Sequence, residues 1–109
     1  MIGNAGARWG VVGPVEAVAD GDAHAVYVAG HPLVIVMLDE HIYAVDGRCP
    51  HRNTLLPGQP LAQGTIRCPL HLFRYDVRGG DCVWPPGWPG VRTYETRVEG
   101  TALLVRMDW

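Results

Sequence analysis

Short runs of apolar and β-branched residues, broken by turn residues, make up the first half of the chain. Three such runs cover residues 25–29, 33–38 and 42–45, and the breaks between them contain Gly30-His31-Pro32 and Asp39-Glu40. Runs of this length between turn residues predict β-strands. We therefore expect three short strands, with a hairpin turn at Asp39-Glu40.

The second half continues in the same way, and no convincing helix appears in it. Residues 65–67 and 73–77 predict one strand pair, and residues 91–98 and 102–107 predict another, joined at Glu99-Gly100. Arg78-Gly79-Gly80-Asp81 predicts a Gly-rich turn. Many short strands with frequent turns indicate an all-β fold, an antiparallel β-sandwich or small barrels.

Composition limits the class of protein. A chain of 109 residues forms a single domain over residues 1–109, and its 48% hydrophobic and 18% charged residues indicate a folded core. All nine basic residues are arginine, and the net charge of −2 gives no reason to expect nucleic acid as a partner. The longest apolar run, residues 32–38, is too short to cross a membrane, and the first residues lack a signal-peptide pattern. We expect a cytoplasmic monomer with no membrane partner.

Two short clusters of metal-binding residue types carry the chemistry. They are Cys49-Pro50-His51 and Cys68-Pro69-Leu70-His71. Each supplies one thiolate and one imidazole, which is the ligand set of a Rieske [2Fe–2S] cluster, where one iron takes both thiolates and the other both imidazoles. We expect Cys49, His51, Cys68 and His71 to bind the iron of one such cluster, in loops near residues 47–56 and 66–76.

This ligand set predicts an electron carrier. Neutral imidazoles in place of two thiolates remove two negative charges, which raises the reduction potential to roughly −150 to +300 mV, against about −400 mV for plant-type ferredoxins. Zinc is the alternative metal for two cysteines and two histidines. Zinc fingers pair cysteine with cysteine and histidine with histidine, whereas here each loop holds one of each.

The chain resembles the Rieske ferredoxin family over residues 15–105. Residues 68–76 with Gly79-Gly80 are similar to the family's C-x-x-H-G-x-x-F-D stretch, Pro85-Pro86 resembles its proline loop, and residues 91–98 and 103–105 resemble its closing strands. Leu72 stands where most members have glycine. With Leu55-Leu56, this makes the loops more similar to ferredoxins of aromatic and alkene monooxygenases.

The resemblance implies an electron-transfer component with no catalytic residue of its own. Such a ferredoxin takes single electrons from a flavin-containing reductase to a terminal oxygenase, with a monooxygenase as our first choice and a ring-hydroxylating dioxygenase as the second. One alternative is the small Rieske-like subunit of a nitrite reductase, although such subunits frequently lack the cluster ligands. The other is a zinc-stabilised interaction module.

The resemblance also implies which residues surround the cluster. Respiratory Rieske proteins use a serine and a tyrosine hydroxyl as donors to sulfur; here Phe73 stands at the serine position and cannot donate, whereas Tyr75 can. We therefore expect a potential in the lower part of the Rieske range. Other residues expected beside the cluster are Pro50, Pro69 and Pro86. The disulfide clamp of respiratory relatives is absent, and Cys82, outside both loops, is expected to be a packed residue.

Three further groups of residues are the tryptophans near the proline loop, the arginines near the ligands and the single histidines. The first two groups each have two interpretations. Trp84 and Trp88 could shield the cluster from water or form part of a docking face, or they could cap the core. The arginines near the ligands could steer an acidic partner, or form an ordinary solvated surface. Single histidines beside turns are expected to be exposed and without a chemical role. The arginines are Arg48, Arg52, Arg67, Arg74 and Arg78, and the histidines are His24, His31 and His41.

Overall fold

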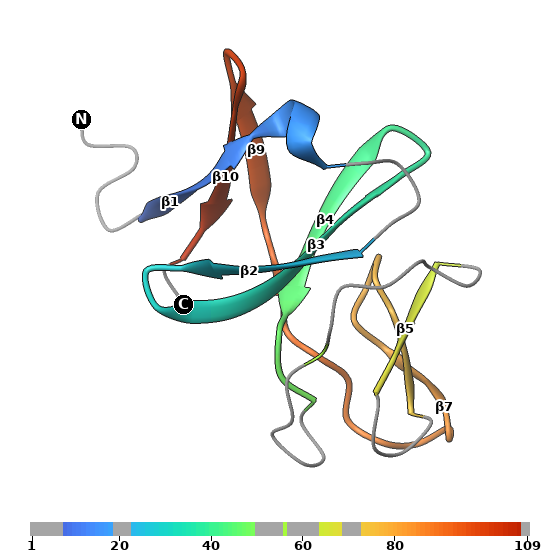
Figure 1. Ribbon diagram of the computed structural model, residues 1–109. Coiled ribbons are helices and arrows are strands. Elements are labelled where there is room, and N and C mark those ends of the chain that lie inside the picture. The colour runs from blue at the N-terminus through green and yellow to red at the C-terminus, as the bar shows by residue number, and fades with distance from the viewer. Residues whose placement is uncertain (1–7, 19–22, 50–55, 57–63, 69–72, 108–109) are drawn as a thin grey trace.

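A computed structural model describes residues 8–18, 23–49, 56, 64–68 and 73–107 (Figure 1). Within these ranges the chain forms strands and one short 3-10 turn, with no α-helix. The elements are β1 (Trp9–Pro14), η1 (Val15–Ala17), β2 (Ala23–Val28), β3 (His31–Leu38), β4 (His41–Asp46), β5 (Thr65–Arg67), β6 (Arg74–Asp76), β7 (Cys82–Trp84), β8 (Thr93–Tyr94), β9 (Thr96–Glu99) and β10 (Ala102–Arg106). No helix in the described ranges is long and apolar enough to cross a bilayer.

The strands form three antiparallel sheets. Their orders are β1-β10-β9, β2-β3-β4-β8 and β5-β6-β7. In Figure 1 the β5-β6-β7 sheet, hereafter the small sheet, lies at one end of the molecule, and β9 and β10 lie at the other. The chain is therefore all-β and antiparallel, as its pattern of short apolar runs predicts.

Strand β3 separates two hydrophobic cores. Successive side chains of a strand point to opposite faces of its sheet. Accordingly, Val34 and Val36 pack in one core, and Leu33 and Ile35 pack in the other. Because β3 lies between β2 and β4 and is covered on both faces, its run of apolar residues is continuous and not alternating.

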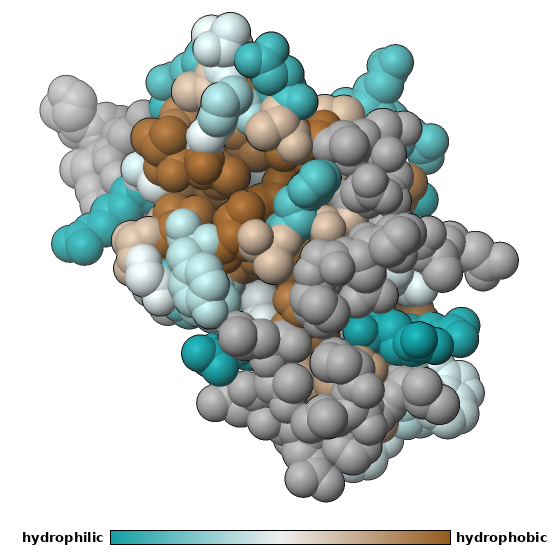
Figure 2. Space-filling view, in the orientation of Figure 1, coloured by the Kyte–Doolittle hydropathy of each residue, from teal (hydrophilic) through white to brown (hydrophobic). Residues whose placement is uncertain are grey.

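The two cores belong to different ends of the molecule. The first contains Cys49, Cys68 and residues of the small sheet, and we call it the cysteine core. The second contains Leu103 and Val105 of β10, and we call it the β10 core. Figure 2 shows apolar side chains gathered between the β1-β10-β9 sheet and β2, at the edge of the β10 core. The two candidate cysteine ligands therefore lie together in the cysteine core.

Most of the predicted strands are present, but one prediction is wrong. Residues 91–98 were expected to form a single strand and instead form two, β8 and β9, which belong to different sheets. Tyr94 pairs with Ala44 of β4, whereas Thr96 pairs with Val105 of β10. The predicted hairpin turn is confirmed, because Asp39 and Glu40 have φ of 52° and 66°, the positive values that a tight two-residue turn requires.

Candidate metal centre

Backbone hydrogen bonds fix the base of the first candidate loop. Gly47 follows β4, and its amide donates to the carbonyl of Pro32 at 2.9 Å. At the other end of the loop, the Leu56 amide donates to the carbonyl of Gly47 at 2.8 Å. A Cβ on Gly47 would lie 2.6 Å from the carbonyl carbon of Pro32, so only glycine fits this close approach of two backbones. Cys49 therefore starts its loop from an anchored backbone.

The second candidate loop joins two paired strands of the small sheet. Arg67, the last residue of β5, pairs with Arg74, the first residue of β6. Between them, the Cys68 amide donates to the carbonyl of Phe73 at 2.8 Å. This hydrogen bond continues the strand pairing one step into the loop and closes its base. Cys68 is thereby held at the end of a short hairpin.

Both cysteines of the candidate ligand set are fully buried and pack in one core. Cys49 and Cys68 are 0% exposed, belong to the cysteine core and form no disulfide. The hydroxyl oxygen of Tyr75 lies 3.1 Å from Cys49 Sγ. Burial raises the pKa of Tyr75, and the hydrogen bond to Cys49 raises it further. The phenol therefore keeps its proton and can donate to a thiolate at Cys49.

This arrangement fits a metal–sulfur group. A buried thiolate without a cation is unfavourable, and burial in apolar surroundings keeps a thiol protonated. An iron held by Cys49 and Cys68 would compensate the thiolate charge, and the Tyr75 hydroxyl could donate a hydrogen bond to the Cys49 sulfur. His51 and His71, the other two predicted ligands, lie outside the described residues, as do Pro50 and Pro69. Among described residues, no group of three or more metal-binding side chains comes together.

Aromatic side chains lie at the mouth of the second loop. Phe73 packs edge-on against Trp88, with ring centroids 5.5 Å apart, and is itself packed against the cysteine core. Trp84 and Trp88 are 56% and 48% exposed, and Pro86 between them is exposed as well. Both tryptophans therefore lie at the surface and not inside the core.

Cys82 has the structural role that was predicted for it. It is partly buried against the cysteine core, and its thiol donates to the carbonyls of Trp84 at 3.5 Å and Pro85 at 3.4 Å. Burial raises the pKa of this thiol, which keeps it protonated. A protonated thiol that donates to two carbonyls is satisfied without a metal.

Two further predictions have mixed outcomes. The expectation that the single histidines are exposed is wrong for His24 and His31, which are partly buried, and is confirmed for His41. His31 Nε2 lies 3.1 Å from the Tyr94 hydroxyl. The arginines expected near the ligands are exposed at all four described positions, namely Arg48, Arg67, Arg74 and Arg78. Arg52 lies outside the described residues.

Comparison with known proteins agrees with this geometry. Residues 8–95 match the family model described as the Rieske [2Fe-2S] domain. The ferredoxin component of the naphthalene 1,2-dioxygenase system of Pseudomonas putida is 31% identical over 99 residues, which covers 86% of this chain and 95% of the relative. The ferredoxin component of the alkene monooxygenase system of Xanthobacter autotrophicus is 27% identical over 84% of this chain and 75% of the relative.

A solved structure extends the similarity to the fold. The ferredoxin of carbazole 1,9a-dioxygenase from Nocardioides aromaticivorans IC177 is 33% identical, with a TM-score of 0.76, and the match covers 87% of this chain and 93% of that one. These matches do not favour the alternatives of a nitrite reductase subunit or a zinc-stabilised module. The chain belongs to the Rieske [2Fe-2S] domain family: it is an electron-transfer ferredoxin component of an oxygenase system, and its cofactor is one [2Fe–2S] cluster.

Proposed function

We propose that Cys49 and Cys68 bind one iron of the cluster and that His51 and His71 bind the other. The observation that carries this proposal is the burial of the two thiols in one core, with the Tyr75 hydroxyl 3.1 Å from Cys49 Sγ. The sequence supports it, because each histidine follows its cysteine within the same short loop. The mixed thiolate and imidazole ligands match those of a Rieske cluster.

The cluster supplies a site that accepts and releases one electron. The chain keeps this site rigid and excludes water from it. Backbone hydrogen bonds at Gly47 and Cys68 fix the bases of both loops, and the packed side chains of the cysteine core exclude water from the thiolate side. A rigid site changes little between its two oxidation states, which lowers the reorganisation that electron transfer requires. Tyr75 donates to Cys49 and stabilises the extra electron of the reduced state.

The electrons come from a flavin-containing reductase and go to a terminal oxygenase. The names of the relatives support this proposal, because they are ferredoxin components of dioxygenase and monooxygenase systems. Higher identity to the naphthalene dioxygenase ferredoxin favours a ring-hydroxylating dioxygenase as the acceptor. The sequence features that pointed to a monooxygenase include Leu55 and Leu72, which lie outside the described residues. We further propose that the protein acts in the cytoplasm as a single-domain monomer.

Reconstitution tests the proposal. Cluster-loaded protein is mixed anaerobically with a flavin-containing reductase and reduced nicotinamide nucleotide, and bleaching of the visible absorption reports reduction. We expect one electron per chain, followed by reoxidation when a substrate-loaded dioxygenase component is added. The naphthalene system of Pseudomonas putida supplies reductase and oxygenase for this assay. If dithionite reduces the cluster but no flavin-containing reductase does, the proposal that such a reductase is the electron donor is contradicted.

A further inference from the structure

The two faces of the small sheet have opposite character. Ile66, Tyr75 and Cys82 point inward to the cysteine core. Side chains alternate along a strand, so Arg67 and Arg74, the neighbours of Ile66 and Tyr75, point outward. On β7 this alternation is interrupted, because the register with β6 shifts between Arg74 and Tyr75. Trp84 therefore pairs with Arg74, as Arg67 does on the other side, and the three residues lie in one row across the sheet. We call Arg67, Arg74 and Trp84 the outer row.

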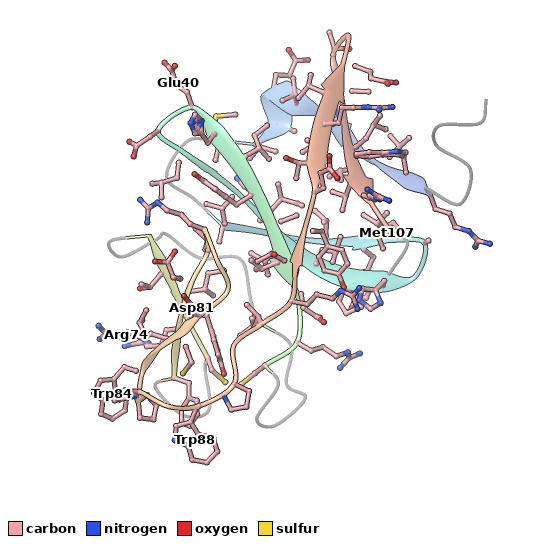
Figure 3. The ribbon with its side chains drawn as sticks, turned by 180° about the vertical axis from the view of Figure 1, so that it is seen from behind. Glu40, Arg74, Asp81, Trp84, Trp88 and Met107 are labelled. Atoms are coloured by element: carbon pink, nitrogen blue, oxygen red, sulfur yellow. The ribbon has the colours of Figure 1, made fainter. Side chains whose placement is uncertain are left out.

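The outer row lies next to the candidate metal centre. Arg67 directly precedes Cys68, and Arg74 directly follows Phe73, whose carbonyl accepts the Cys68 amide at 2.8 Å. Figure 3 shows Arg74, Trp84 and Trp88 at the end of the molecule far from Glu40. A protein that covers the outer row would therefore lie within a few residues of a candidate iron ligand.

The charge of this end of the small sheet is positive. Asp76 is the only acidic residue between Gly47 and Gly80. It lies at the other end of the sheet, where its Oδ1 accepts the Arg78 amide at 2.8 Å and lies 3.8 Å from Arg78 Nη1. Arg67 and Arg74 are both exposed and face each other across two strands. The two arginines thus place two positive charges in directly opposite positions of neighbouring strands.

The aromatic residue of the outer row exposes apolar surface to water, which is unfavourable unless a partner covers it. Trp84 is 56% exposed, and its strand neighbour Val83 is 44% exposed. Tryptophan and arginine are the residue types most enriched among those that dominate binding energy at protein interfaces. A cationic pair beside an exposed tryptophan fits a partner surface that offers carboxylates around an apolar contact.

We infer that the outer row of Arg67, Arg74 and Trp84 is a docking surface for an acidic redox protein, which it holds beside the Cys68 end of the cluster. This inference rests on the proposed function, and it specifies the surface and the partner chemistry. The arginines attract and orient carboxylates of the partner, and Trp84 provides the apolar contact that excludes water from them. Trp88, whose ring contacts Phe73, lies at the same end of the molecule.

The test uses fully reduced flavodoxin, a small acidic flavoprotein, as the probe that passes one electron to the oxidised cluster. The variants are Arg67→Glu with Arg74→Glu, the neutral pair Arg67→Gln with Arg74→Gln, and Trp84→Ala. Matched controls are Arg97→Glu with Arg106→Glu, which changes the charge equally on β9 and β10, and Tyr27→Ala, an aromatic residue 63% exposed on β2. Each protein is first checked for a wild-type visible spectrum and midpoint potential.

At low ionic strength, the Arg67→Glu, Arg74→Glu pair should slow electron transfer at least tenfold, and the neutral pair and Trp84→Ala should each slow it several-fold. Both controls should stay within twofold of the wild type, and salt should slow the wild type most. Equal slowing by the two charge-reversal pairs would show an effect of net charge alone and overturn the inference. Rates unchanged in all variants would overturn it as well. Loss of the cluster in the wild type would instead contradict the proposed function.

Discussion

The hydroxyl of Tyr75 lies 3.1 Å from the sulfur of Cys49, although one residue starts the first candidate loop and the other follows the second. Cys49 starts the first loop after β4, and Tyr75 is the central residue of β6, which follows the second loop. Neither atom is exposed to water, because both residues are buried in the cysteine core. One hydrogen bond therefore ties the small sheet to the base of the first loop.

Removal of this hydroxyl should lower the midpoint potential. A hydrogen bond to sulfur stabilises the reduced state more than the oxidised state, because the reduced cluster carries one more negative charge. A differential interaction of about 1 kcal/mol corresponds to about 40 mV for one electron. We expect Tyr75→Phe to lower the potential by roughly this amount in protein-film voltammetry. Tyr94→Phe, which removes a hydroxyl directed at His31, should leave the potential unchanged. No shift for Tyr75→Phe would remove this residue from the surroundings of the cluster.

Gly47→Ala should destabilise the base of the first loop. The new Cβ would lie 2.6 Å from the Pro32 carbonyl carbon and 2.8 Å from the Leu33 nitrogen, so backbone has to move. Overpacking of this kind costs about 1–3 kcal/mol in the free energy of unfolding. Gly79→Ala is the matched control, because its Cβ would meet nothing closer than a side-chain oxygen of Asp81 at 3.7 Å. Thermal denaturation measures both variants, and equal stability of the two would refute the close approach at Gly47.

The division into two cores predicts separable effects of two large-to-small substitutions. Ile66 and Leu103 are both fully buried, Ile66 in the cysteine core and Leu103 in the β10 core. Truncation of either to alanine should cost about 2–5 kcal/mol in the free energy of unfolding. Only Ile66→Ala should also alter the visible spectrum and midpoint potential of the cluster. A changed cluster in Leu103→Ala would show that the two cores are not independent.

Tyr94 should make the protein less stable in alkali. Burial raises the pKa of its phenol above the ordinary value of 10.0, the Asp46 charge raises it further, and Arg92 partly opposes this. The folded state therefore keeps a proton that the unfolded state loses. The stability that Tyr94 contributes is complete below pH 10 and is lost as the pH rises through its folded pKa. Urea midpoints from about pH 8 to about pH 11.5 should fall more steeply for the wild type than for Tyr94→Phe. Parallel curves would contradict the raised pKa.

The sequence predicts the interior strands best. The apolar runs that became β3 and β4 are flanked by turn residues, and their pairing through a two-residue turn at Asp39-Glu40 is local. Strand β1 was missed because Gly10, Gly13 and Pro14 weaken its strand signal, and its partner β10 lies at the other end of the chain. Pairing between distant segments leaves no local pattern.

For the candidate site, residue types and spacing within each loop were enough to propose Cys49 and Cys68 as ligands, because metal chemistry restricts the choice of ligands. Their burial in one core is seen only in the structure. The break of residues 91–98 at Glu95 was not predictable, since this segment contains no glycine or proline that would mark a turn. The outer row was also missed, because it depends on the register of β6 with β7, which shifts between Arg74 and Tyr75.

The content of iron and acid-labile sulfide tests the central claim most directly. Wild-type protein and Cys82→Ser should each hold two irons and two sulfides per chain, as a [2Fe–2S] cluster requires. Cys49→Ser and Cys68→Ser should hold neither and should unfold more easily, because cluster binding is coupled to folding. Stoichiometric zinc without sulfide in wild-type protein expressed with adequate iron would contradict the account, as would a full cluster in either Cys49→Ser or Cys68→Ser.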